Sequence, residues 1–341
     1  LLKAGDFDGI RYLVDGALKA GQDKNLGHEY VKDIEERYKE ESRITIPTPW
    51  PKINDLLQGG LGNGDFGLIF GSPGAGKSWS LVSVGGRAVR LGYNVIHYTL
   101  ELGEAYVGKR YDAFFTKIDV RELHNNKEKV EEIIPQLPGK LVIKEFPTGR
   151  ATMSTIESHI KKVESLGIKA DLIIIDYVDL LSSGRKNRER KDDIDDIYTS
   201  TKGLAKQLDI PVWSVSQVNR AGANDEIIEG DKAAGSYDKI MITDFCMSLS
   251  RKKEDKVGGT GRLHIMKNRY GMDGHTFSVT ANTATGHFEV FPYNTDLSGD
   301  EESFAPKTRS NSYDDVDAHT KRKAAAAYDQ VKQDIFSFEK K

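Results

Sequence analysis

At residues 71–78 the chain reads Gly71-Ser72-Pro73-Gly74-Ala75-Gly76-Lys77-Ser78, which matches the pattern G-x-x-x-x-G-K-[ST] of phosphate-binding loops. Residues 66–70 before it are apolar enough for a buried strand, and Trp79 after it opens a stretch patterned as a helix. In such a strand–loop–helix setting, glycines let the backbone N–H groups point at phosphates, and the helix N-terminus favours negative charge. We therefore predict that residues 71–79 bind a nucleoside triphosphate, with Lys77 at the β- and γ-phosphates and Ser78 on Mg²⁺.

Strands and helices alternate around this loop. We expect strands at 66–70, 94–99, 140–146, 171–175 and 211–215, and helices at 79–89, 103–116, 127–135, 152–166 and 192–208. Further strands are expected near 241–250, 261–267, 276–280 and 286–290. The run at 171–175 is continuously apolar, as in strands buried on both faces of a sheet. The alternation predicts an α/β fold, a mostly parallel twisted sheet with helices on both faces.

The ends of the chain differ from its centre. Apolar residues at helical spacing predict helices over 6–20 and 28–41, and the proline-rich stretch 46–51 marks a boundary. Seven acidic side chains and few apolar ones occur in 296–317, which predicts a disordered linker, and 318–338 is patterned as a helix. We therefore expect N-terminal linker helices (1–45), a main domain (46–293) and an acidic linker with a helical tail (294–341).

Composition limits the possible partners. Among 341 residues 30% are charged, yet the formal net charge is only −3, so a nucleic-acid partner must be argued from local basic clusters. The single cysteine, Cys246, stands in an apolar run and excludes a disulfide framework. No run of eighteen apolar residues and no signal peptide occur, so we expect a cytoplasmic protein without a membrane partner. Because the chain opens on Leu1, we also expect it to be a fragment lacking upstream sequence.

Two carboxylates follow expected strands. Asp176 ends the apolar run 171–175, where a carboxylate at the carboxyl edge of the sheet can orient Mg²⁺ beside the phosphate loop. Glu101 follows the strand at 94–99 and is placed to polarise an attacking water as general base. For Glu101 the alternative is a first-turn carboxylate of the helix at 103–116.

Polar side chains also follow two later strands. Gln217 comes after the strand at 211–215, where an amide can hydrogen-bond a γ-phosphate or the attacking water. Lys267 and Arg269 stand two residues apart on an expected strand, so their side chains point the same way and can stabilise charge in phosphoryl transfer. For these two cations the alternative is a solvated edge strand.

Basic residues crowd the loop after Asp176 and define the 185–191 cluster: Arg185, Lys186, Arg188, Arg190 and Lys191. Nucleic-acid phosphates are the natural counter-ions of such a cluster at this edge of the sheet, and a solvated loop is the alternative. A second long loop on the same edge runs from Ala221 through Asn224 to Ser236, and we expect Arg220 and Asn224 to contact DNA as well.

Taken in order, these segments resemble the ATPase domain of the DnaB-type hexameric replicative helicases, a branch of the RecA-like fold, in a phage-like form. The resemblance covers about 46–290 and rests on 46–48, 71–78, 99–101, 174–177, 216–220, 235–236 and 267–269. It does not extend to the family's helical N-terminal domain. The resemblance implies that Glu101 is the catalytic base, that Gln217 senses the γ-phosphate, and that Lys267 and Arg269 act on a neighbouring subunit's nucleotide. It also implies that Arg110 lies near the nucleotide and that the loops at 182–193 and 221–236 line a central channel.

By this resemblance the chain is expected to be an ATP- and Mg²⁺-dependent helicase core that moves on single-stranded DNA as a homo-hexamer and unwinds duplex. A primase or helicase loader is the expected further partner, through the N-terminal helices or the C-terminal tail. Two alternatives stay open: a RecA-like recombinase or clock-type ATPase, and an ATP-gated DNA-binding adaptor without motor activity.

Overall fold

The computed structural model describes residues 9–10, 13–14, 27, 29–35, 43–184, 190–218, 225–230 and 237–293. The chain divides into two units, Leu1–Asn294 and Thr295–Lys341, and only the first contains described residues. The helices expected at 6–20 and 28–41 lie largely outside the described residues, and the expected acidic linker and tail helix lie wholly outside them. The three-part division of the chain stays a prediction.

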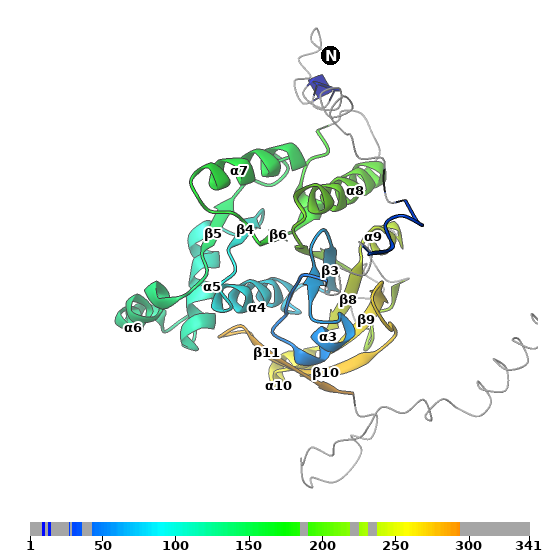
Figure 1. The fold of residues 1–341 in the computed structure, drawn as a ribbon. Coiled ribbons are helices and arrows are strands. Elements are labelled where there is room, and N and C mark those ends of the chain that lie inside the picture. The colour runs from blue at the N-terminus through cyan, green and yellow to red at the C-terminus, as the bar shows by residue number, and fades with distance from the viewer. Residues whose placement is uncertain are drawn as a thin grey trace, which may run out of the picture. The chain divides into compact units, whose positions relative to one another are not determined.

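The described residues of the first unit form a nine-stranded sheet in the order β11-β10-β9-β8-β3-β7-β6-β4-β5 (Figure 1). Six strands run parallel: β8 (Phe245–Ser250), β3 (Phe66–Gly71), β7 (Val212–Gln217), β6 (Leu172–Asp176), β4 (Val95–Thr99) and β5 (Leu141–Glu145). Three strands continue the sheet antiparallel: β9 (Thr260–Asn268), β10 (Thr276–Asn282) and β11 (His287–Pro292). A mostly parallel sheet was predicted, and it is confirmed.

Helices cover both faces of the sheet (Figure 1). On one face lie α3 (Pro51–Leu56), α4 (Lys77–Arg90), α5 (Glu104–Thr116) and α6 (Lys127–Ile133), and on the other lie α7 (Met153–Ser165) and α8 (Arg190–Leu208). Short 3₁₀ turns occur at Leu123–Asn126, Ile134–Gln136 and Val178–Leu180. A two-residue ladder pairs β1 (Thr45–Ile46) with β2 (Leu61–Gly62). No helix among the described residues is both long and apolar enough to cross a membrane.

Alternation along the central strands divides the apolar core in two. In β6, Leu172 and Ile174 join the core under α4 and α5, whereas Ile173 and Ile175 join the core under α7 and α8. All four side chains are fully buried, which explains why the run carries no polar residue. Burial of each such side chain contributes roughly 1.5–3 kcal/mol to the free energy of folding, so the central strands stabilise the sheet.

Close packing of α4 explains its two interior glycines, which would otherwise weaken a helix. A Cβ on Gly85 would lie 2.3 Å from the Tyr111 hydroxyl, and one on Gly86 would lie 2.4 Å from the Phe114 ring. Both aromatic residues belong to α5. The glycine pair therefore lets α5 lie directly against α4, which places Arg110 of α5 at the edge of the sheet where the phosphate loop lies.

The prediction of a strand near 241–250 is wrong at its beginning. Residues 241–242 end a helix, α9 (Tyr237–Ile242), and the strand starts only at Phe245. Ile240 is buried whereas Met241 is exposed, so this apolar segment covers the sheet with one helical face. The structure also contains α10 (Lys253–Gly258), a charged helix that apolar periodicity did not indicate.

Candidate functional site

The predicted phosphate loop joins β3 to α4. Gly74 and Gly76 have φ angles of 73° and 106°, a left-handed backbone that favours glycine. The Lys77 ammonium donates to the carbonyl oxygens of Gly71 at 2.9 Å and Ser72 at 3.1 Å, so the side chain folds back over the loop. Burial lowers the pKa of Lys77, while the Asp176 and Glu101 carboxylates act in the opposite direction. The loop thus presents the positive charge of Lys77 at the start of α4. The N-terminus of the helix attracts anions as well, so both features favour a bound phosphate.

A cavity of about 400 Å³ opens beside this loop at the carboxyl edge of the sheet. It gathers ten of the predicted site residues: Pro73, Gly74, Gly76, Lys77, Ser78, Trp79, Glu101, Arg110, Asp176 and Gln217. Gly71, Ser72 and Ala75 complete the loop but do not line the cavity, because they are buried beneath it. The cavity therefore joins residues from the loop after β3, from α4 and α5, and from the ends of β4, β6 and β7, as expected where parallel strands end together.

Asp176 is the most buried charged group of the cavity. Its side chain is 2% exposed, and its Oδ1 atom has no hydrogen-bond partner among the described residues. Burial raises the pKa of the carboxyl, while a hydrogen bond with the Ser78 hydroxyl acts in the opposite direction. An unpartnered carboxylate oxygen beside a serine hydroxyl is a donor set that suits Mg²⁺, which prefers oxygen ligands. These residues therefore fit the predicted metal.

Glu101 and Gln217 stand on either side of Asp176 at the ends of β4 and β7. Thr99, two residues before Glu101, pairs with Asp176, and Gln217 pairs with Gly71 at the start of the phosphate loop. Both side chains are exposed, and the Gln217 amide donates to the Tyr177 hydroxyl at 3.3 Å. The strand register thus brings both predicted residues to the cavity.

An ion pair between Lys239 and Asp179, largely buried in the protein, contacts the end of β7. Lys239 of α9 is 3% exposed, contacts the Asp179 carboxylate and donates to the Ser216 hydroxyl at 3.1 Å. The Tyr198 hydroxyl of α8 donates to both oxygens of Asp179 at 3.3 Å. Since Ser216 immediately precedes Gln217, this network fixes the strand end that presents the amide.

Arg110 and Trp79 form one wall of the cavity. The Arg110 guanidinium carbon lies 5.1 Å from the Trp79 ring centroid and 5.9 Å from that of Tyr106, distances typical of cation–π contacts. Burial lowers the pKa of Arg110, and the Asp176 carboxylate counteracts this. The guanidinium is therefore held by aromatic faces, with its charge directed at the cavity.

Five lining residues were not predicted from the sequence: Tyr177, Val215, Arg251, Lys256 and Thr283. Lys256 of α10 donates to the Pro73 carbonyl of the phosphate loop at 3.1 Å. The Arg251 guanidinium is 5% exposed and donates to the carbonyl oxygens of Thr260 at 2.8 Å and Asp255 at 3.3 Å. Both cations come from a charged stretch after β8 that matches no motif. Only their proximity to the phosphate loop identifies them.

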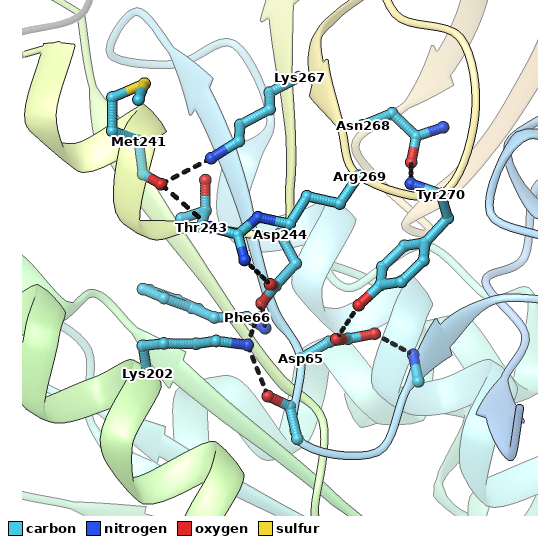
Figure 2. A network of polar contacts seen from close by, with 12 residues as sticks. Asp65, Phe66, Lys202, Met241, Thr243, Asp244, Lys267, Asn268, Arg269 and Tyr270 are labelled. Atoms are coloured by element: carbon cyan, nitrogen blue, oxygen red, sulfur yellow. Dashed lines mark hydrogen bonds and ion pairs between the residues drawn. The ribbon is translucent and has the colours of Figure 1, made fainter. Parts of the chain in front are cut away.

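Lys267 and Arg269 do not lie in the cavity. Asn268 pairs with Phe245 at the start of β8, and Phe245 pairs with Gly67, whereas Leu249 at the other end of β8 pairs with Gly71. The antiparallel β9 therefore carries the two cations to the amino edge of the sheet, opposite the phosphate loop. Their side chains converge on the Met241 carbonyl, as Figure 2 shows. Their spacing in the sequence predicted that the two side chains point the same way.

Of the predicted DNA-binding residues, the structure describes only Arg190 and Lys191. They open α8, and the Lys191 ammonium lies 3.7 Å from the Asp238 carboxylate with 61% of its side chain exposed. Arg185, Lys186, Arg188, Arg220 and Asn224 lie outside the described residues. The two loops in question leave the sheet after β6 and β7, at the edge where the cavity lies.

A mostly parallel sheet, a phosphate loop and neighbouring carboxylates at one edge define the class of P-loop nucleoside triphosphatases. Within that class, residues 45–289 match the family model described as the DnaB-like helicase C terminal domain, so the chain belongs to that family. This finding confirms the resemblance that the motifs indicated.

Individual relatives agree. A DnaB-like replicative helicase of Enterobacteria phage T4 is 24% identical over 288 residues, which cover 79% of this chain and 60% of that protein. A solved ATPase domain aligns with a TM-score of 0.65 at 20% identity, covering 80% of this chain and all of that one. A solved DnaB-like replicative helicase, studied with its primase interactions, aligns with a TM-score of 0.65 at 18% identity, covering 86% of this chain and 74% of that one. The two structures confirm the predicted RecA-like fold.

Proposed function

We propose that the chain is the motor core of a replicative DNA helicase, which hydrolyses ATP with Mg²⁺, moves on single-stranded DNA and unwinds duplex as a homo-hexameric ring. The chain spans 60% of the length of its phage T4 relative. The observation that carries the proposal is the division of the chemistry between two edges of one sheet. The cavity lies at the carboxyl edge, and Lys267 and Arg269 lie at the amino edge.

The cavity residues divide the work of phosphoryl transfer. Backbone N–H groups of residues 74–78 and the Lys77 ammonium would bind the phosphates, and Ser78 and Asp176 would hold Mg²⁺. The metal would supply neutralisation of the negative charge on the phosphates. Glu101 would polarise the attacking water and accept its proton, and Gln217 would hydrogen-bond the γ-phosphate. Arg110, stacked on Trp79, would contact the nucleotide from the side.

The cations at the amino edge need a second subunit. A head-to-tail contact that closes a rotation produces a ring and brings the amino edge of one subunit to the cavity of the next. Lys267 and Arg269 would then stabilise the charge that develops in the neighbour's transition state. An arginine finger of this kind contributes about 10³ to 10⁵ in rate, so a subunit without its neighbour is nearly inactive.

The DNA would pass the edge where the two long loops begin. The 185–191 cluster, Arg220 and Asn224 would contact the phosphates of a single strand in the central channel. One structural neighbour is a helicase described together with its primase interactions, which supports a primase, or a helicase loader, as a further partner through either terminal segment. We place the protein in the cytoplasm of a bacterial or phage-infected cell.

Mixed rings test the division between subunits. Glu101→Gln and Arg269→Ala damage opposite sides of one interface, so each variant alone should be nearly inactive in DNA-stimulated ATP hydrolysis. A mixture contains some interfaces with both residues intact, and its hydrolysis should exceed the sum of the two variants. Subunit exchange is verified by energy transfer between labelled subunits, and Lys162→Ala, which removes an exposed cation of α7, is the control. Parent-level hydrolysis by Arg269→Ala would remove the proposed role of the amino edge.

Unwinding is measured separately, with a labelled strand on a forked duplex. The parent protein should release the strand only with ATP and Mg²⁺, and Lys77→Ala should release none. ATP hydrolysis that occurs without strand release or directional movement would favour a DNA-binding adaptor instead.

A further inference from the structure

A buried carboxylate lies directly behind the two cations of the amino edge. Asp244, in the turn between α9 and β8, is 2% exposed. It accepts hydrogen bonds from the Phe66 backbone N–H at 2.8 Å and from the Lys202 ammonium, and its Oδ1 lies 3.3 Å from Nη1 of Arg269 (Figure 2). Its backbone is bound on both sides as well, because its N–H donates to the Phe66 carbonyl oxygen at 2.9 Å and its own carbonyl oxygen accepts from the Arg269 N–H at 3.0 Å. Asp244 is therefore fixed to β3, the central strand of the sheet.

The guanidinium of Arg269 also contacts the end of α9, just before this turn. Nη2 lies 3.5 Å from the Met241 carbonyl, and the Lys267 ammonium donates to the carbonyls of Met241 at 2.6 Å and Ile240 at 2.9 Å. These carbonyls end α9, where a helix favours positive charge. The end of α9 thus binds both cations through backbone carbonyls, and the Asp244 carboxylate aligns the guanidinium.

The charges of this corner do not cancel. Lys202 is 14% exposed, and its ammonium contacts Asp244 and donates to the Gly64 carbonyl at 2.8 Å. Lys202 therefore compensates the buried carboxylate, as such a group requires. Arg269 keeps 48% of its side chain exposed and is not needed to neutralise Asp244. Its positive charge stays available to an anion outside the subunit.

We propose that Asp244, neutralised by Lys202, is a positioning residue that aims the Arg269 guanidinium at the nucleotide of the neighbouring subunit. The inference rests on the proposed function, in which Arg269 acts across the interface. A flexible arginine must lose side-chain freedom to reach a transition state, and a carboxylate that holds it beforehand lowers that cost. Asp244 itself touches no substrate.

Asp244→Asn keeps the shape of the side chain and an oxygen for the Phe66 N–H but removes the charge that aligns Arg269. We expect the kcat for ATP hydrolysis to fall by about 10- to 100-fold, since misplacing a group by about 1 Å costs up to 10²-fold, with the KM for ATP near the parent value. Asp65→Asn is the matched control. Asp65 is a buried carboxylate of the same corner that contacts Arg43 and Tyr270 but not Arg269, so kcat should stay within about twofold.

Mixed rings separate positioning from a general structural defect. If Asp244 acts through Arg269, Asp244→Asn damages the same side of the interface as Arg269→Ala, so mixing these two should restore nothing. Mixing Asp244→Asn with Glu101→Gln should restore hydrolysis above the sum of the two. A merely structural defect would rescue neither partner, and a defect in the subunit's own cavity would give the reverse pattern.

Each outcome decides between the two proposals. Parent-level kcat for Asp244→Asn, with Arg269→Ala inactive, overturns the positioning role and leaves the proposed function intact. Parent-level hydrolysis by Arg269→Ala overturns both. Should Asp244→Asn not fold, Asp244→Glu keeps the charge while displacing it, and it should show reduced kcat with the same mixing pattern; mixing in the reverse pattern overturns the proposal.

Discussion

Replacing Asp176 with asparagine should make the nucleotide-free protein more stable while abolishing metal-dependent hydrolysis. The carboxylate is buried and its Oδ1 atom has no partner among the described residues. Burial raises its pKa, and the hydrogen bond with Ser78 does not fully offset this. The folded chain therefore holds a carboxylate that would be more stable without its charge, and the asparagine removes the charge at constant shape.

The size of the effect follows from the unpartnered atom. A buried polar group without a partner costs about 1–3 kcal/mol, and more when it is charged; asparagine keeps a polar atom at this place but not the charge, so the free energy of unfolding should rise by about 1 kcal/mol, the lower end of that range. In a domain of roughly 150–250 residues, each kcal/mol raises Tm by about 2–4 °C. Thermal unfolding followed by circular dichroism, in EDTA and without nucleotide, measures the difference. The control is Glu101→Gln, an exposed carboxylate at the same edge, whose stability should stay within about 0.5 kcal/mol of the parent.

The pH dependence has a definite sign. Between the ordinary carboxyl pKa and the raised value of Asp176, the folded chain binds more protons than the unfolded chain. The parent therefore loses stability as the pH rises through this window, and the variant does not, so the advantage of the variant should disappear at the acid end. With Mg²⁺ and ADP the order should reverse, because binding stabilises the parent more strongly. A variant less stable than the parent in EDTA at pH 7 would refute the reasoning.

Three further predictions follow from the site. Lys77→Ala should fold normally, as near-parent circular dichroism would show, yet lose ATP hydrolysis, because it removes the charge that stabilises the transferring phosphate; a folded variant that hydrolyses at the parent rate would exclude the phosphate-loop role. Neutralising three cations of the 185–191 cluster should weaken binding to single strands of any sequence and flatten log affinity against log salt by roughly 0.7 per lost contact, with an unchanged slope as the contrary result. Lys239→Met leaves the largely buried Asp179 carboxylate without its cation and should lower the free energy of unfolding, measured in urea, by about 3–5 kcal/mol, so a loss below about 1 kcal/mol would contradict the network.

The sequence predicts two kinds of feature: strands with a regular apolar pattern, and site residues that directly follow those strands. Strands buried on both faces must be continuously apolar, so β6 and its parallel neighbours were visible as apolar runs. Polar residues that directly follow such runs must meet at one edge, so the sequence predicts one site for Asp176, Glu101 and Gln217, and all three line the cavity. Strand register, and not distance along the chain, brings them together.

Other features depend on contacts between distant segments that no local pattern records. Asp244 follows an apolar segment and precedes a strand, and nothing in its neighbours indicates that Lys202 and Arg269 meet there. Lys256 belongs to a charged helix that would be solvated in isolation, and only its place beside the phosphate loop gives it a contact. Residues 241–242 were included in the strand predicted near 241–250, whereas burial of Ile240 and exposure of Met241 show one face of a helix that covers the sheet.

Because β9 runs antiparallel to β8, the two cations and the cavity lie at opposite edges of the sheet. Each subunit therefore has two unlike ends, as a monomer of a directional polymer has a head and a tail. On the proposed arrangement, an open string of subunits always holds one complete site fewer than it has members, because its last cavity faces no cations. Closing the string recovers that site and leaves no unused end. ATP hydrolysis per subunit should then depend on assembly in two ways. It should be nearly lost on dilution to monomers, and it should rise when an open string closes, because the closed ring has one more complete site. Opening a closed ring to admit a DNA strand would therefore silence the one site at the gap, while the others stay complete.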